Sequence, residues 1–160
     1  MVIFLDTSAA YALADPGDLA HRRAREGFER IEREREELVL HTYVLVEIFA
    51  LLHRRRGLEA ALRTSDRLRE VRTVVVDRAI HDEGAAWLER RRDAGTSLVD
   101  AVSFVVMRRE RIRKAFAFDE DFVCAGFELY GGGGAVGEGS PPVRNASRRR
   151  RRSSPPSTRP

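Results

Sequence analysis

The sequence has almost no cysteine and almost no lysine. Cys124 is the single cysteine among 160 residues, so no disulfide can form within the chain, and a reducing compartment is expected. Lys114 is the single lysine beside many arginines, a bias that indicates a GC-rich genome rather than a function. No apolar stretch approaches the roughly 20 residues that a membrane-spanning helix needs. The opening apolar residues meet Asp6 too soon for a signal peptide. We therefore expect a soluble cytoplasmic protein.

The positive charge of the chain is confined to its carboxyl-terminal end. The formal net charge is +4, from 29 Lys and Arg against 25 Asp and Glu. Residues 131–160 contain seven arginines and one glutamate, so residues 1–130 carry 22 basic and 24 acidic side chains, a net charge of −2. Charge therefore gives no sign that the folded part binds nucleic acid. The Gly-, Pro-, Ser- and Arg-rich segment 131–160 cannot bury a core, so we predict one domain, residues 1–130, followed by a disordered tail.

Apolar strand patterns alternate with helical patterns along residues 1–130. Strands are predicted at Val2–Leu5, Leu38–Leu40, Thr73–Val76, Ala115–Phe118 and Phe127–Tyr130. Helices are predicted at Thr7–Ala14, Asp18–Glu37 with Asp18 as N-cap, Thr42–Arg55, Leu58–Glu70, Ile80–Arg92 and Ser97–Arg111. This alternation predicts an α/β domain with a parallel sheet and right-handed crossovers.

Two acidic residues interrupt helices that are otherwise apolar. Glu47 is the only charged residue between positions 43 and 52, and Asp100 is the only one between positions 98 and 107. A carboxylate on a buried helix face is costly unless it is paired with a cation or bound to a metal. These two side chains therefore call for a partner.

Two further acids follow apolar strands. Asp6 comes directly after the first predicted strand and Asp119 directly after the fourth. Because ligand sites in parallel α/β sheets form beyond the carboxyl ends of the strands, all four acids could converge there. Converged carboxylates raise one another's pKa, and Mg²⁺ or Mn²⁺ relieves this because hard cations prefer oxygen ligands. An acid-only metal site suits phosphodiester hydrolysis.

Each acid also has a structural interpretation. Asp6 could cap the helix that follows it, and Ser97 with Asp100 fits a capping box. Asp119 could cap the turn 119–122, and Glu47 could form a buried ion pair with an arginine. The histidines lack metal-ligand spacing, and we interpret all four as surface or partly buried residues: His21, His41, His53 and His81.

The stretches around the acids resemble the motifs of the PIN-domain ribonucleases, most closely the VapC-like toxins of bacterial toxin–antitoxin pairs. The similarity covers residues 2–130, and its four motifs are Val2–Ala9, Thr42–Leu52, Thr96–Ala101 and Ala117–Phe122. The resemblance implies a three-layer α/β sandwich around a parallel sheet of four or five strands. It also implies a Mg²⁺- or Mn²⁺-dependent endoribonuclease that cuts RNA, a homodimer, and a small antitoxin partner.

The same resemblance assigns roles to individual residues. Asp6, Glu47 and Asp100 would be metal ligands, and Asp119 would be the fourth, bound directly or through water. Asp121 replaces Asp119 if the alignment is displaced by two positions. The hydroxyl residues of these motifs could position water or carboxylates: Thr7, Ser8 and Ser103.

Two other functions are compatible with parts of this pattern. A catalytically weak module could use the same fold to hold RNA or a protein, although it would have no need of four acids. A phosphatase of the haloacid-dehalogenase type also begins with an aspartate after a strand. That chemistry wants a second acid two residues later, where this chain has Ser8.

Overall fold

Strands and helices alternate from the first residues onward. The computed structural model describes residues 1–91 and 95–130. The strands in this part of the chain are β1 (Val2–Leu5), β2 (Glu37–His41), β3 (Arg72–Val74), β4 (Lys114–Phe116) and β5 (Glu128–Leu129). The helices are α1 (Thr7–Ala14), α2 (His21–Glu34), α3 (Thr42–Arg56), α4 (Leu58–Arg67), the 3₁₀ helix η1 (Leu68–Glu70), α5 (Arg78–Arg91), α6 (Leu98–Arg109) and α7 (Asp121–Cys124).

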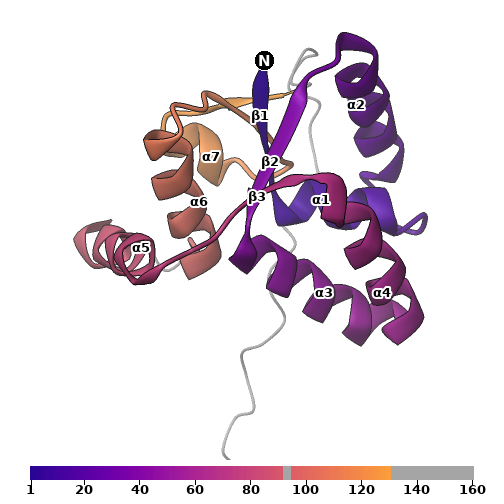
Figure 1. Ribbon diagram of the computed structural model, residues 1–160, viewed down its shortest axis with the longest axis horizontal. Coiled ribbons are helices and arrows are strands. Elements are labelled where there is room, and N and C mark those ends of the chain that lie inside the picture. Colours follow the sequence, from indigo (N-terminus) through magenta and orange to yellow (C-terminus); the bar gives the residue numbers. More distant parts are fainter. Residues whose placement is uncertain (92–94, 131–160) are drawn as a thin grey trace, which may run out of the picture.

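The five strands form one sheet in the order β3-β2-β1-β4-β5, and every neighbouring pair is parallel. In Figure 1, α5 and α6 lie on one side of the strands and α2 lies on the other. The result is a sandwich of three layers with the sheet in the middle. The prediction of an α/β fold around a parallel sheet of four or five strands is confirmed.

β1 lies at the centre of the sheet because its side chains are apolar on both faces. Ile3, Phe4 and Leu5 are at most 2% exposed, as expected for a strand covered by helices on both sides. Leu5 pairs with Phe116 of β4 on one side, while β2 lies on the other. The chain passes from β1 into α1 through Asp6, which fixes this carboxylate at the carboxyl edge of the sheet.

α6 is held in place by close packing against α5. A Cβ atom at Gly84 would lie 2.7 Å from Cγ2 of Val102, so only glycine allows this approach of the two helices. Trp87 of α5 packs against Phe104 of α6 with the ring centroids 5.1 Å apart and the ring planes tilted by 56°. Both rings are buried, so Trp87 belongs to the core. The position of α6 in turn fixes Asp100, which lies in its first turn.

Several elements differ from their predicted bounds, among them α2 and β4. α2 begins at His21, and Asp18 is not its N-cap, because the Asp18 side chain instead accepts a hydrogen bond from the Ala20 amide in the preceding turn. β4 ends at Phe116, and the next residues turn away from the sheet. A short helix, α7, was not predicted, because four residues are too few to show a helical period.

The predicted disordered tail, residues 131–160, lies outside the described residues. Among the helices of residues 1–91 and 95–130, none has the length and apolar character required to cross a membrane.

Candidate active site

The parallel sheet brings acids that are distant in sequence to one edge. Asp6 follows the central strand β1, and the loop that carries Asp119 follows its neighbour β4. α3 starts where β2 ends, and α6 runs back toward the start of β4, so its first turn lies at the same edge (Figure 1). The electrostatic coupling among the acids, described below, agrees with this placement.

Asp6 is the most deeply buried of the acids. Its side chain is 3% exposed. Oδ2 accepts hydrogen bonds from the Ser8 amide at 2.9 Å and from the Ser8 hydroxyl at 2.6 Å. The predicted N-cap role is therefore real, but it uses one oxygen only. Oδ1 is buried and has no hydrogen-bond partner among the described residues, a costly state for a carboxylate unless a proton or a cation satisfies it.

Glu47 projects from α3 and is half-buried rather than fully buried. Its Oε2 atom accepts a hydrogen bond of 2.8 Å from the hydroxyl of Thr7, the first residue of α1. Within the described part of the chain no arginine or lysine pairs with Glu47. The alternative of a buried ion pair is thus not what the structure shows.

Asp100 is also half-buried, and it takes part in the capping box at the start of α6. Its Oδ2 atom accepts hydrogen bonds from the Ser97 amide at 2.9 Å and the Ser97 hydroxyl at 2.6 Å. The Asp100 amide donates to Ser97 Oγ at 3.1 Å. As at Asp6, the capping interaction occupies Oδ2 and leaves Oδ1 without a hydrogen bond from the described residues.

Asp119 is the most exposed of the four predicted acids. It lies beyond the end of β4 rather than directly after it, and its Oδ1 atom accepts a hydrogen bond of 3.0 Å from the Asp121 amide. The predicted turn-capping role is present. Asp121 is half-buried, and its Oδ2 atom accepts a hydrogen bond of 3.3 Å from the Thr96 hydroxyl.

Electrostatic coupling joins these acids into one group with Asp100 at its centre. Burial, together with the negative charge of Asp100, raises the pKa of Asp6 to about 7 against the lowering effect of its Ser8 hydrogen bonds. Burial also raises the pKa of Glu47, where Thr7 opposes the shift and Asp100 adds to it. The pKa of Asp100 is raised by burial and by Asp119 and Asp121, in that order, against the effect of Ser97.

The carboxylate oxygens of these acids suit a hard divalent cation, but the side chains do not form a complete coordination shell. Among the described residues, no three His, Cys, Asp or Glu side chains converge closely enough to hold an ion by themselves. Two observations favour a cation nevertheless: the unsatisfied buried Oδ1 of Asp6 and the mutual raising of carboxyl pKa values. Mg²⁺ usually keeps several waters and is bound through one or two carboxylates, so an open set of acids is compatible with such an ion.

A buried histidine links the two helices that carry Glu47 and Asp100. His41 ends β2, caps α3 and is fully buried, so its interpretation as a surface or partly buried residue is wrong. The Val44 amide donates to Nδ1 at 3.3 Å, which places the ring hydrogen on Nε2. Nε2 lies 2.9 Å from Oγ of Ser103 on α6, and Ser103 donates to the Val99 carbonyl at 2.9 Å. Ser103 thus orients helices rather than contacting a carboxylate.

Sequence reasoning missed this link because a single histidine between a strand and a helix has no local signal of burial. Its partner lies 62 residues further along the chain. Burial also lowers the pKa of His41 to about 4, so the ring is neutral near neutral pH.

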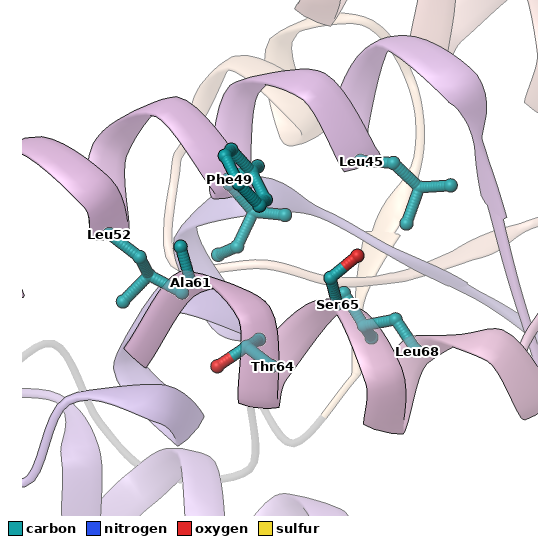
Figure 2. A pocket seen from close by; sticks show the side chains of 8 residues that line it. Leu45, Phe49, Leu52, Ala61, Thr64, Ser65 and Leu68 are labelled. Atoms are coloured by element: carbon teal, nitrogen blue, oxygen red, sulfur yellow. The ribbon is translucent and has the colours of Figure 1, made fainter. Parts of the chain in front are cut away.

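A separate hollow lies between α3 and α4. Figure 2 shows Phe49 and Leu45 from α3 facing Ser65 of α4 and Leu68 of η1 across it. Its lining has no charged side chain, and none of the predicted acids belongs to it. This hollow is therefore not part of the candidate active site.

Known proteins share this fold and much of the sequence. Residues 3–128 match the family described as PIN domain. The 23S rRNA-specific endonuclease VapC20 of two Mycobacterium tuberculosis strains is 39% identical over 129 residues, which are 79% of this chain and 95% of the relative. The crystal structure of M. tuberculosis VapC20, described as a sarcin–ricin loop cleaving toxin, superposes with a TM-score of 0.70 at 38% identity, covering 78% of this chain and 95% of that one.

A more distant structure has the same fold. VapBC2 from Rickettsia felis, bound to a DNA fragment from its promoter, superposes with a TM-score of 0.61 at 13% identity. The superposition covers 81% of this chain and 97% of that chain. At this level of identity the similarity concerns the fold alone.

Proposed function

This chain belongs to the PIN-domain family, and on that basis we propose that it is a metal-dependent endoribonuclease, the toxin of a toxin–antitoxin pair. The carboxylate of Asp6 carries the proposal. It is buried, its pKa is raised to about 7, and its Oδ1 atom has no partner among the described residues. A residue that only capped α1 would not need this burial, because a capping carboxylate works equally well when exposed.

Nucleases of this family generally use divalent metal ions, and we propose Mg²⁺ here, with Mn²⁺ as a substitute. Asp6, Glu47 and Asp100 would hold the ion, and Asp119 would reach it directly or through a water, with Asp121 as its alternative. When bound, such an ion polarises a phosphoryl oxygen and lowers the pKa of a bound water.

The hydroxyl residues prepare the acids for this task. Ser8 and Ser97 each fix one oxygen of a neighbouring carboxylate through a bond of 2.6 Å, so the other oxygen is directed elsewhere. Thr7 fixes one oxygen of Glu47. These bonds orient ligands that would otherwise repel one another and rotate apart.

The substrate class follows from the relatives. VapC20 is named for cleavage of 23S rRNA and of its sarcin–ricin loop, and we propose ribosomal RNA as the substrate of this chain too. The remaining features belong to the same proposal: a cognate antitoxin protein as partner, a homodimer, and a cytoplasmic location.

Cleavage of purified bacterial ribosomal RNA by the full-length protein tests the proposal. We expect cleavage with Mg²⁺ or Mn²⁺ that stops in EDTA, and growth arrest when the protein is expressed alone. Asp6→Asn and Asp100→Asn should each lower cleavage by at least about a hundredfold while the far-ultraviolet circular dichroism stays unchanged. The matched control is Asp66→Asn, which removes an exposed acid of α4.

Two outcomes would contradict the proposal. Unchanged cleavage by Asp6→Asn would show that the acidic site is not the catalytic one. RNA binding that is indifferent to EDTA, without cleavage of any RNA, would instead favour the catalytically weak binding module.

A further inference from the structure

The arginines of α2 differ in what they contact. Arg22, Arg25 and Arg30 each form an ion pair with the glutamate four residues later, at 3.9, 3.1 and 3.7 Å. Arg23 has no ion pair with a carboxylate within residues 1–91 and 95–130: the residue four positions later is Gly27, and Glu26 pairs with Arg22 instead. Its charge is therefore available for a ligand.

Packing explains why Gly27 cannot be an acid. A Cβ atom at this position would lie 2.9 Å from Cε2 of Phe116 in β4. α2 therefore approaches the end of β4 closely, and any larger residue would push the helix away. The same approach brings Arg23 over the ring of Phe118, with the guanidinium carbon 5.2 Å from the ring centroid. An arginine already held over an aromatic ring loses little further freedom when it binds a ligand.

Phe118 is connected to the buried Asp6 through a single residue, Ser8. Its amide donates to Oγ of Ser8 at 3.0 Å, and this hydroxyl donates to Asp6 at 2.6 Å. The next residue along the chain is Asp119. Arg23 and Phe118 thus form a cationic and aromatic pair at the α2 side of the candidate active site, with the guanidinium exposed and the ring half-buried.

An acidic site that cuts RNA has an electrostatic difficulty. Its carboxylates repel the phosphates of the strand, and the folded part of the chain has a net charge of −2. A nearby guanidinium offsets this repulsion, because its planar donors match two oxygens of one phosphate. An aromatic ring beside it provides a surface on which an unpaired base can stack.

We propose that Arg23, held against Phe118, binds a phosphate of the RNA strand next to the scissile position. Arg23 contributes to substrate binding, whereas the acidic residues carry out the chemical step. This inference rests on the proposed function.

The experiment compares Arg23→Gln with the matched control Arg22→Gln. Both remove one positive charge from an exposed arginine of the same helix. Binding is measured by fluorescence anisotropy in EDTA, on a synthetic RNA hairpin with the sarcin–ricin loop sequence, over a series of salt concentrations. Cleavage of the same hairpin is measured with Mg²⁺.

Arg23→Gln is expected to raise KM and the hairpin Kd by about fivefold to tenfold, with kcat within about twofold of wild type. The slope of log affinity against log salt should fall by nearly one, the value for loss of a single phosphate contact. Arg22→Gln should change each quantity by less than about twofold. Phe118→Leu should weaken binding in the same direction, and its combination with Arg23→Gln should cost less than the two changes added.

The outcomes separate this inference from the proposed function. If the wild type cleaves and Arg23→Gln behaves like Arg22→Gln, only the inference is overturned. If the wild type binds the hairpin through Arg23 but cleaves no RNA with Mg²⁺ or Mn²⁺, only the proposed function is overturned. Absence of any salt-dependent binding of the hairpin by the wild type overturns the inference, and it overturns the proposed function as well only if the wild type also cleaves no RNA with Mg²⁺ or Mn²⁺. An Arg23→Gln protein with altered kcat and unaltered KM also overturns the inference, because it would place Arg23 in the chemical step.

Discussion

His41 and Ser103 are hydrogen bonded at 2.9 Å in the core, although 62 residues separate them in sequence. The bond connects the start of α3, which carries Glu47, to the first turns of α6, which carry Asp100. Both side chains are 0% exposed, so water cannot replace either partner. The neutral, buried imidazole of His41 thus helps to fix the distance between α3 and α6, the helices that carry Glu47 and Asp100.

Replacing Ser103 by alanine should destabilise the protein. The Nε2 hydrogen of His41 would lose its acceptor in the core, at a cost of about 1–3 kcal/mol in the free energy of unfolding. Urea denaturation at neutral pH measures this as a lower midpoint with an unchanged slope. Ser65→Ala removes an exposed serine of α4 and serves as the control, with an expected change within about 0.5 kcal/mol. Equal effects of the two substitutions would contradict the assigned role of the bond.

Asp6 should make the metal-free protein less stable as the pH rises. Its pKa is raised from the ordinary 3.8 to about 7 in the folded protein, so the folded state binds a proton that the unfolded state has released between these values. The free energy of unfolding therefore contains a term that is largest below the ordinary pKa and is lost as pH rises through about 7. Asp6→Asn lacks this titration and keeps an oxygen for the Ser8 amide.

The test for Asp6 is denaturation in EDTA between about pH 5 and pH 8. The advantage of Asp6→Asn over wild type should grow with pH and exceed about 1 kcal/mol at the upper end. For Asp66→Asn the difference from wild type should not grow in this way. Added Mn²⁺ should reverse the order by stabilising wild type alone. A difference that does not vary with pH would show that Asp6 is ionised in the metal-free fold.

Thr7→Val should weaken metal binding through Glu47. Without the hydroxyl that donates to Oε2, the pKa of Glu47 rises further, because this hydrogen bond lowers it. We expect Mn²⁺ affinity near pH 7 to fall by about tenfold, as for other residues that orient a metal ligand. The defect should shrink at higher pH, where the carboxyl loses its proton more readily. Thr7→Ser restores the donor and should recover affinity to within about threefold; titration calorimetry measures all three proteins. If Thr7→Ser fails to recover, the methyl group rather than the hydroxyl is what matters.

The choice between Asp119 and Asp121 can be decided by comparing their asparagine variants. Both raise the pKa of Asp100, and Asp119 has the larger effect. Asp119→Asn should therefore lower Mn²⁺ affinity and cleavage by about tenfold, and Asp121→Asn by about twofold. The reverse order would mean that Asp121 is the fourth acid and that the fourth motif is displaced by two residues.

The local pattern of apolar and polar residues was enough to predict those parts of the fold that are formed by contiguous residues. The run Val2–Leu5 and the acid after it predicted β1 and the start of α1 correctly, because a strand buried on both faces leaves a continuous apolar signal. The positions of the acids after strands and in apolar helices supplied the expectation that they meet, and their coupling through Asp100 agrees with it. Whether they bind metal is still a prediction.

Features that depend on distant residues were not predictable in this way. β4 ends earlier than its apolar pattern suggests, because the Phe118 amide bonds to Ser8 Oγ instead of a neighbouring strand. The burial of His41 depends on Ser103, which no local window includes. The capping interpretations of Asp6, Asp100 and Asp119 were also correct, so capping by one carboxylate oxygen does not by itself argue against the metal-ligand prediction for these residues.

The central strand of the sheet has its two neighbours at very different distances along the chain. β2 is the next strand after β1 in sequence, whereas β4 lies near the end of the domain. The Phe118 amide, just after β4, and its partner Ser8, just after β1, are 110 residues apart. During synthesis, β1 therefore has one bare edge until nearly the whole domain has left the ribosome. Asp100 and Asp119 emerge at this last stage, so a nascent or prematurely ended chain has Asp6 and Glu47 but no complete site. We therefore expect the nuclease to have no activity until β4 has paired with β1 and the acids have come together.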